Sequence, residues 1–184
     1  SKHQAFFNLM PNRTMRTVTA SVSPTGAGTV TVNGSANSAE VMEGITATLV
    51  ATANSGYTFS HWSKGGAQVS TEKTYKALVA AEGNDYVANF LTVGNNRVNV
   101  SVSYNSSYGT VTYNSNAVSG TGITPYQNSE VTLVATPLDG YVFNGWTVIK
   151  GTNSTPHSGT ELTFVATEDM RVEANFSTAE IDYS

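Results

Sequence analysis

The chain has 184 residues, of which only 12% are charged, and its formal net charge is -4 at pH 7. Since charged residues make up roughly a quarter of an ordinary soluble domain, Ser, Thr, Asn and Gly must supply most of the polar surface. A hydrophobic fraction of 39% is typical of a folded chain rather than a disordered one. The sequence has no sustained basic patch, which argues against nucleic acid as a partner. No run approaches the roughly 18 apolar residues that insert in a membrane.

The chemistry-bearing residues point away from catalysis and from metal or cofactor binding. The chain contains no cysteine, which excludes disulfides, thiolate zinc sites and cysteine nucleophiles. The three histidines are far apart and lack the spacing of a metal motif, and no Gly-x-Ser-x-Gly elbow occurs. The acidic residues that crowd the second half form no calcium-loop pattern and are typical of solvated surface charge. They are Glu161, Glu168, Asp169 and Glu173. We therefore expect no enzyme, no metal and no cofactor.

Four short strings occur twice in the chain, in the same order. They are Gly-Thr-Val-Thr at 28–31 and 109–112, Leu-Val-Ala-Thr at 49–52 and 133–136, Gly-Tyr-x-Phe-x-x-Trp at 56–62 and 140–146, and Ala-Asn-Phe at 88–90 and 174–176. Chance could produce one such match, but hardly four in order. The sequence therefore predicts two tandem repeats.

Within each repeat the apolar residues alternate with polar ones, which predicts β-strands. Val and Thr dominate these runs, as half-buried pleated surfaces favour, and Gly, Asn, Ser and Asp gather at the turns between them. About six short strands are expected per repeat. In the first repeat they lie near 18–22, 30–32, 47–51, 57–62, 74–82 and 86–90, and in the second near 98–102, 111–113, 131–135, 141–146, 161–166 and 172–176. Residues 76–82 could instead form a short helix.

The most specific string predicts a strand, a tight turn and a returning strand. Gly56 and Gly140 supply positive φ at the two turns. Tyr57 and Phe59 share one face by parity, whereas Trp62 has the opposite parity. A β-bulge near His61 would bring Trp62 round to the same face. The aromatic residues of both copies are interpreted as core rather than as a sugar-stacking platform. The structural motif comprises Gly56, Tyr57, Phe59, Trp62, Gly140, Tyr141, Phe143 and Trp146.

This order of strings resembles the divergent internalin-type B-repeat family, a bacterial repeat domain. The resemblance covers residues 17–90 and 97–176. It implies tandem modules in bacterial cell-surface or secreted proteins, acting as spacers or adhesion modules, and no catalytic residues to carry over. Related internalin repeats have a β-grasp-like fold. The expected architecture is all-β, with two small modules, sandwich- or β-grasp-like, arranged as beads on a string.

The repeats also set the expected domain boundaries. Module 17–90 is followed by a linker at 91–96, then by module 97–176 and a C-terminal linker at 177–184. Residues 1–16 are interpreted as the tail of an upstream repeat plus a linker. The reason is that His3, Ala5 and Phe7 show the same alternation as the last strand of each repeat, including Ala88 and Phe90.

Four tyrosines of the second repeat have no aromatic counterpart in the first. They are Tyr104, Tyr108, Tyr113 and Tyr126. A repeat does not need them for its fold, and tyrosine offers contact area at low entropy cost, so they are candidates for binding a glycan or protein. The alternative is scattered surface tyrosine.

Two functions remain open from the sequence. The first is a stalk, spacer and adhesion region of an extracellular or cell-surface bacterial protein, with a host or matrix protein, a glycan, or further repeats of the same chain as partners. The second is a glycan-binding accessory module of a secreted carbohydrate-active enzyme.

Overall fold

The computed structural model describes residues 14–180, and its regular elements there are all β-strands, which confirms the all-β fold class. The chain divides into two compact units, Ser1–Thr92 and Val93–Ser184, called module 1 and module 2 below. The division falls inside residues 91–96. The strand expected at residues 3–7 lies outside the described residues, as does part of the expected C-terminal linker.

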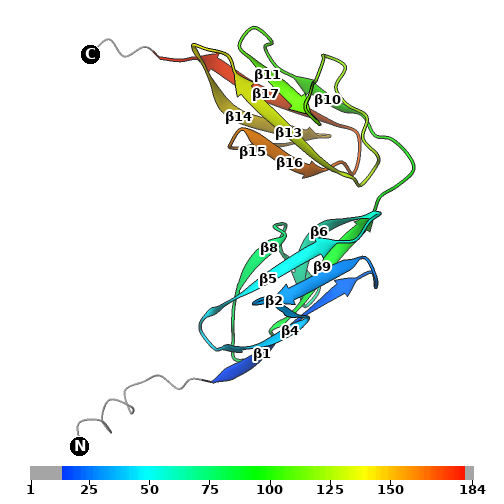
Figure 1. The fold of residues 1–184 in the computed structure, drawn as a ribbon, viewed down its shortest axis with the longest axis vertical. Helices are drawn as coiled ribbons and strands as arrows, with labels where there is room; N and C mark the ends of the chain where they lie inside the picture. Colours follow the sequence, from blue (N-terminus) through cyan, green and yellow to red (C-terminus); the bar gives the residue numbers. More distant parts are fainter. Residues whose placement is uncertain (1–13, 181–184) are drawn as a thin grey trace, which may run out of the picture. The chain divides into compact units, whose positions relative to one another are not determined.

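Module 1 is a sandwich of two sheets that share one core (Figure 1). The first sheet has the order β4-β1-β9-β6-β7 and the second the order β3-β2-β5-β8. The strands are β1 (Met15–Ser23), β2 (Gly28–Val32), β3 (Ser35–Ala36), β4 (Ser38–Met42), β5 (Thr46–Ala53), β6 (Tyr57–Lys64), β7 (Ala67–Ser70), β8 (Thr74–Leu78) and β9 (Asp85–Thr92).

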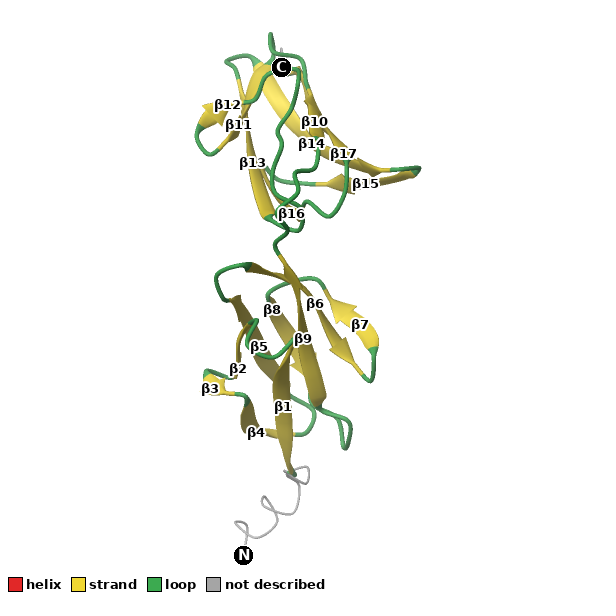
Figure 2. Ribbon diagram, turned by 90° about the vertical axis from the view of Figure 1, so that its right-hand side faces the viewer, coloured by secondary structure: helices red, strands yellow, loops and turns green. Residues whose placement is uncertain are grey.

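Module 2 repeats this topology with one strand fewer (Figure 2). Its sheets have the orders β10-β17-β14-β15 and β12-β11-β13-β16. The strands are β10 (Val100–Ser103), β11 (Gly109–Tyr113), β12 (Asn116–Ala117), β13 (Glu130–Pro137), β14 (Tyr141–Lys150), β15 (Asn153–His157), β16 (Glu161–Val165) and β17 (Met170–Thr178). No strand of module 2 matches β4. Isolated bridges take its place: one joins Arg97, three residues before β10, to Tyr126, and the other joins Val100, the first residue of β10, to Ile123.

The expected six strands per repeat undercount the observed nine and eight. The additional strands are two-residue pieces, β3 and β12, and edge strands such as β15, all five of whose residues are exposed. β3, β12 and β15 bury no alternating apolar face, so they carry no periodic signal. Residues 74–78 form strand β8 rather than part of a helix. No helix occurs among residues 14–180, and of the two expected architectures the sandwich is the one observed.

The core of each module comes from the alternation read in the sequence. Val18 and Ala20 of β1 are buried in module 1, and Val100 and Val102 of β10 are buried in module 2. These side chains pack in two separate hydrophobic clusters, one within each module. Each module therefore has its own hydrophobic core, separate from that of the other module.

The first and last full strands of each module lie side by side and parallel. β1 pairs with β9 from Thr19 opposite Asp85 to Ser23 opposite Asn89. The matching pair in module 2, β10 and β17, begins where Val100 lies opposite Met170. All other strand pairings within the described residues are antiparallel. The chain thus enters and leaves each module through neighbouring strands of one sheet.

Candidate functional site

The turn of the Gly-Tyr-x-Phe-x-x-Trp string connects the two sheets of a module. Gly56 has φ 82° and Gly140 has φ 86°, in the left-handed region that glycine tolerates. The backbone N–H of Tyr57 donates to the carbonyl of Asn54 at 3.1 Å across the turn. The strand that returns does not pair with the strand before the turn, because β5 and β6 belong to different sheets. The strand, tight turn and returning strand expected from the string are present, but the turn carries the chain from one sheet of the sandwich to the other.

The expected bulge is present in both modules. The pairing register shifts between Phe59 and His61 in β6, and between Phe143 and Gly145 in β14. One extra residue in each strand brings the tryptophan to the inner face. The rings of Phe59 and Trp62 have centroids 5.9 Å apart.

Both tryptophans are core residues, as expected. Trp62 is 0% exposed and Trp146 is 1% exposed. Each indole N–H is satisfied by a backbone carbonyl: that of Lys73 at 3.3 Å in module 1 and that of Gly159 at 2.9 Å in module 2. A sugar could not stack on rings that are buried in this way.

The asparagine of the Ala-Asn-Phe string holds the bulge in place. In module 1 the side-chain amide of Asn89 donates to the carbonyl of His61 at 3.2 Å and to Oγ of Ser63 at 2.9 Å. In module 2 Asn175 donates to the carbonyl of Gly145 at 3.1 Å. Sequence reasoning missed this role, although the recurrence of Asn in the string was its signal.

The phenylalanine of the same string explains the glycine of Gly-Thr-Val. A Cβ at Gly28 would lie 2.6 Å from Cζ of Phe90, and a Cβ at Gly109 would lie 2.5 Å from Cζ of Phe176. Real Cβ atoms do not come that close to other heavy atoms. The recurring strings are therefore parts of one packing arrangement that joins the start and the end of each module.

Two of the four candidate tyrosines lie at the same end of module 2. The hydroxyl of Tyr104 donates to the carbonyl of Val118 at 2.7 Å, and its ring lies 6.4 Å from that of Phe176. Tyr108 stacks on Tyr141, with ring centroids 4.4 Å apart and planes 22° apart. Both tyrosines are partly buried, so a share of their surface is already used within the module.

The other two candidate tyrosines lie elsewhere. Tyr113 is at the far end of β11 from Tyr108 and packs partly buried against the core. Five residues of extended strand separate these two tyrosines by about 16 Å. Tyr126 is 44% exposed, and the guanidinium carbon of Arg97 lies 3.8 Å from its ring centroid, a cation–π contact. The four residues therefore do not form one surface.

A groove of about 630 Å³ opens beside the β14–β15 hairpin of module 2. It lies between β15, the edge strand of one sheet, and β16, the edge strand of the opposing sheet. Asn153, Thr155 and His157 line it from β15, Lys150 from β14, and Phe164 from β16, with Glu168 beyond. Sequence reasoning did not find this groove, because β15 has no apolar pattern.

Module 1 has Lys64 at the position of the groove residue Val148, and two tyrosines lie beside that lysine. Tyr75 and Tyr86 pack edge to face with ring centroids 6.0 Å apart, and Nζ of Lys64 lies 5.6 Å from the centroid of Tyr86. The repeat alignment puts Leu162, Val172 and Val148 at these three positions of module 2. Burial raises the pKa of the Tyr86 phenol.

The acidic residues of module 2 do not converge. Asp169 accepts the backbone N–H of Asn99 at 2.7 Å, and Glu173 forms an ion pair with Arg171 at 3.5 Å. No group of three or more His, Asp or Glu side chains within residues 14–180 could hold a metal ion. A search of the same residues found no helix with the length and apolar character needed to cross a membrane.

Comparison with known proteins gave one result. Neither the curated proteins nor the solved structures contained a match to this chain. A family model described as the divergent InlB B-repeat domain matches residues 18–94 and 99–180. These two regions coincide with the two sandwiches, and together they cover most of the chain. The chain therefore belongs to the divergent InlB B-repeat family, of which it contains two tandem copies.

Proposed function

We propose that the two modules are a non-catalytic spacer and adhesion region of a bacterial cell-surface or secreted protein. The observation that carries this proposal is that each module closes its own core while the chain enters by one strand and leaves by its parallel neighbour. Modules of this kind can follow one another without sharing a core. Membership of a bacterial repeat family supports the same role.

The surface chemistry also suits a spacer. With 12% charged residues and a net charge of -4, the modules present hydroxyl and amide groups rather than a strong field that would recruit charged partners. Two of the acidic residues of module 2 already have partners, since Asp169 accepts the backbone N–H of Asn99 and Glu173 pairs with Arg171. We propose accordingly that the chain has no catalytic activity of its own.

Small-angle scattering on tandem fusions of the complete chain tests the spacer role. One, two and three copies of the 184-residue chain should show a maximum dimension that increases with each added copy. The urea midpoint should stay constant, because each module has its own core. Added copies that leave the maximum dimension unchanged, or that shift the midpoint, would contradict the proposal.

A second function, glycan binding, is favoured by the groove of module 2. Its lining combines amide and hydroxyl groups with the ring of Phe164, and the charges of Lys150 and Glu168 offset each other. A neutral oligosaccharide suits such a lining, because it has many hydroxyl groups and an apolar face but no charge. A volume of about 630 Å³ is in the range of small-molecule sites, about 300–1,000 Å³.

A glycan array followed by calorimetry on the hit separates this function from the first. Asn153→Ala and His157→Ala should each weaken binding, whereas Gln68→Ala on β7, the equivalent edge strand of module 1, should not. All three side chains belong to edge strands, so none of the changes opens the core. If binding disappears instead with Tyr108→Ala, the tyrosines are the site. An array with no hit removes the glycan function.

A further inference from the structure

We propose that the parallel pair of first and last strands is a mechanical clamp, and that the clamp of module 1 withstands a higher pulling force than that of module 2. This inference rests on the proposed spacer function, because a spacer is pulled at its two ends. It concerns β1 with β9 in module 1 and β10 with β17 in module 2.

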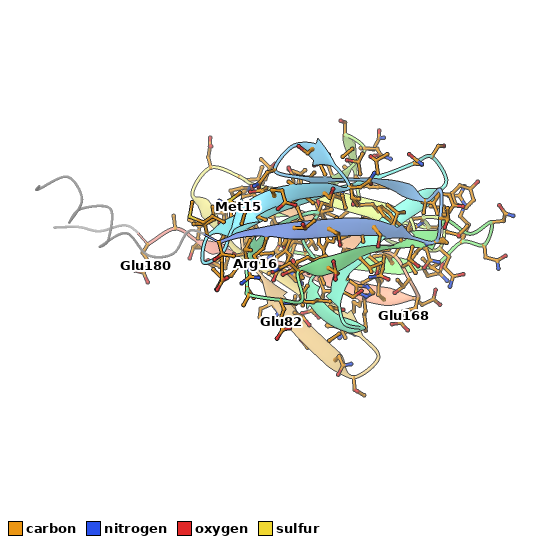
Figure 3. The ribbon with its side chains drawn as sticks, turned by 90° about the horizontal axis from the view of Figure 1, so that it is seen from below. Met15, Arg16, Glu82, Glu168 and Glu180 are labelled. Carbon is orange, nitrogen blue, oxygen red and sulfur yellow. The ribbon has the colours of Figure 1, made fainter. Side chains whose placement is uncertain are left out.

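The geometry of entry and exit sets the direction of the force. Pulling on the chain applies force at Met15, the first residue of β1, and at Thr92, the last residue of β9. Figure 3 labels Met15 beside Arg16 at the start of β1. Since the two strands are parallel, the start of one and the end of the other lie at opposite ends of the pair (Figure 1). Tension therefore slides β1 along β9 instead of peeling it away.

The hydrogen bonds of the clamp lie across this direction and share the force. The backbone N–H of Thr19 donates to the carbonyl of Asn84 at 3.0 Å. In a parallel ladder the bonds are evenly spaced and alternate residues face the partner strand, so Ser21 and Ser23 also face β9. A sliding force loads all of these bonds together, whereas a peeling force would load and break them one after another.

Side chains add to the resistance of module 1. Oγ1 of Thr19 donates to a carboxylate oxygen of Asp85 at 2.6 Å. The inner face of β1 carries Val18 and Ala20, which are 0% and 3% exposed. Sliding β1 by one residue would turn its apolar side chains to the wrong face. The clamp therefore cannot slip without loss of core packing.

The other side of the first strand differs between the modules. In module 1, β1 also pairs with β4 from Met15 opposite Met42 to Thr19 opposite Ser38, and Arg16 forms an ion pair with Glu43 at 2.8 Å. In module 2 no strand pairs on that side, but the chain leading into β10 makes two isolated bridges and several backbone hydrogen bonds: Val98 donates to the carbonyl of Pro125, and Val100 and Ile123 exchange two. The β10–β17 register also has one residue pair fewer than that of β1 and β9. The parallel ladder that carries the load is therefore shorter in module 2, so module 2 should yield first.

Single-molecule force spectroscopy in two pulling geometries tests the clamp. The complete chain is held at its C-terminus and pulled either from its N-terminus or from Thr25→Cys. Thr25 is exposed in the turn after β1, and the chain has no other cysteine. Attachment at residue 25 pulls β1 and β9 from the same end, so the pair peels. The rupture force of module 1 should fall severalfold, and that of module 2 should stay unchanged.

A disulfide assigns each rupture to its module. Ser21 lies opposite Val87 in the clamp, so the double variant Ser21→Cys with Val87→Cys can lock module 1 when it is oxidised. Oxidised molecules pulled from the N-terminus should show only the lower-force rupture, and reductant should restore the higher one. If the disulfide does not form, contour length identifies the module instead. Unfolding of module 1 should release a shorter length of chain when the molecule is pulled from residue 25 than when it is pulled from the N-terminus.

Two results would overturn the clamp: equal module 1 forces in both geometries, or a higher force for module 2 than for module 1. Neither result would contradict the spacer role, provided that the maximum dimension of tandem fusions still increases with each added copy. Conversely, a maximum dimension that does not increase would contradict the spacer role. A difference in the rupture force of module 1 between the two pulling geometries would still establish the clamp.

Discussion

Replacing Gly109 with alanine should destabilise module 2 through one contact. The new Cβ would lie 2.5 Å from Cζ of Phe176 and 2.8 Å from its Cδ1. The ring cannot easily move away, because it packs between Phe143 at 5.2 Å and Tyr104 at 6.4 Å between centroids. Gly109 does not have positive φ, so the backbone itself accepts alanine and the cost comes from packing.

The expected size of the effect follows from overpacking. Forcing an extra carbon into a packed core costs about 1–3 kcal/mol. Phe176→Ala alone is also destabilising, because it removes a partly buried ring from the core cluster. The two changes should not add, since the alanine at 109 has no ring to meet once Phe176 is gone. The double variant should therefore be no less stable than Phe176→Ala, with a coupling energy of about 1–3 kcal/mol.

Urea unfolding followed by tryptophan fluorescence measures this cycle. Each module has one tryptophan, so a Trp62→Phe background leaves Trp146 to report module 2 alone. Gly28→Ala is the matched variant in module 1, read from Trp62 in a Trp146→Phe background. There the new Cβ also meets the backbone carbonyl of Thr52, so Phe90→Ala should rescue it only in part. Additive free energies at Gly109 and Phe176 would refute the packing argument.

Three further predictions concern the core, the bulge and pH. Trp146→Ala should cost about 3–5 kcal/mol, as for other buried aromatic truncations, measured by calorimetry on the complete chain; an unchanged transition would contradict the core assignment. Asn89→Ala should cost module 1 about 1–3 kcal/mol, because the carbonyl of His61 loses its donor, with module 2 as the internal control. Burial raises the pKa of Tyr86, so its contribution is complete below the ordinary pKa of about 10 and is lost as pH rises through the higher folded value. Alkaline urea titrations should therefore show module 1 weakening in a way that Tyr86→Phe abolishes, and an identical profile in that variant would count against this reasoning.

The features that the sequence could predict are those that leave a periodic or repeated trace. Alternation at Val18 and Ala20 revealed strands, and the recurrence of Trp62 as Trp146 revealed core positions. The bulge was readable because the parity of Trp62 disagreed with that of Phe59, and the structure resolves this conflict by a register shift.

Pairing partners leave no such trace. Periodicity reports which face of a strand is buried, but not which strand lies beside it, so the sequence did not show that the chain changes sheets at Gly56. Edge strand β15, with the sequence Asn-Ser-Thr-Pro-His, buries none of its side chains and was not expected. The groove depends on that strand and was therefore missed with it.

The same parallel pair that joins the two ends of a module also shapes how the module folds. β1 is made first, yet its neighbour β9 follows only after the rest of the module, with Ser21 opposite Val87. Closing so long a loop is slow, and in a tandem array the last strand of the next repeat offers a similar Ala-Asn-Phe string. Exchange of strands between neighbours is a characteristic misfolding route of repeat proteins. The two repeats differ where such an exchange would matter, because Tyr86 packs on Tyr75 while the next repeat has Val172 at that position. A borrowed strand would leave a cavity beside Tyr75, so sequence divergence between adjacent repeats favours the pairing of each first strand with the last strand of its own module.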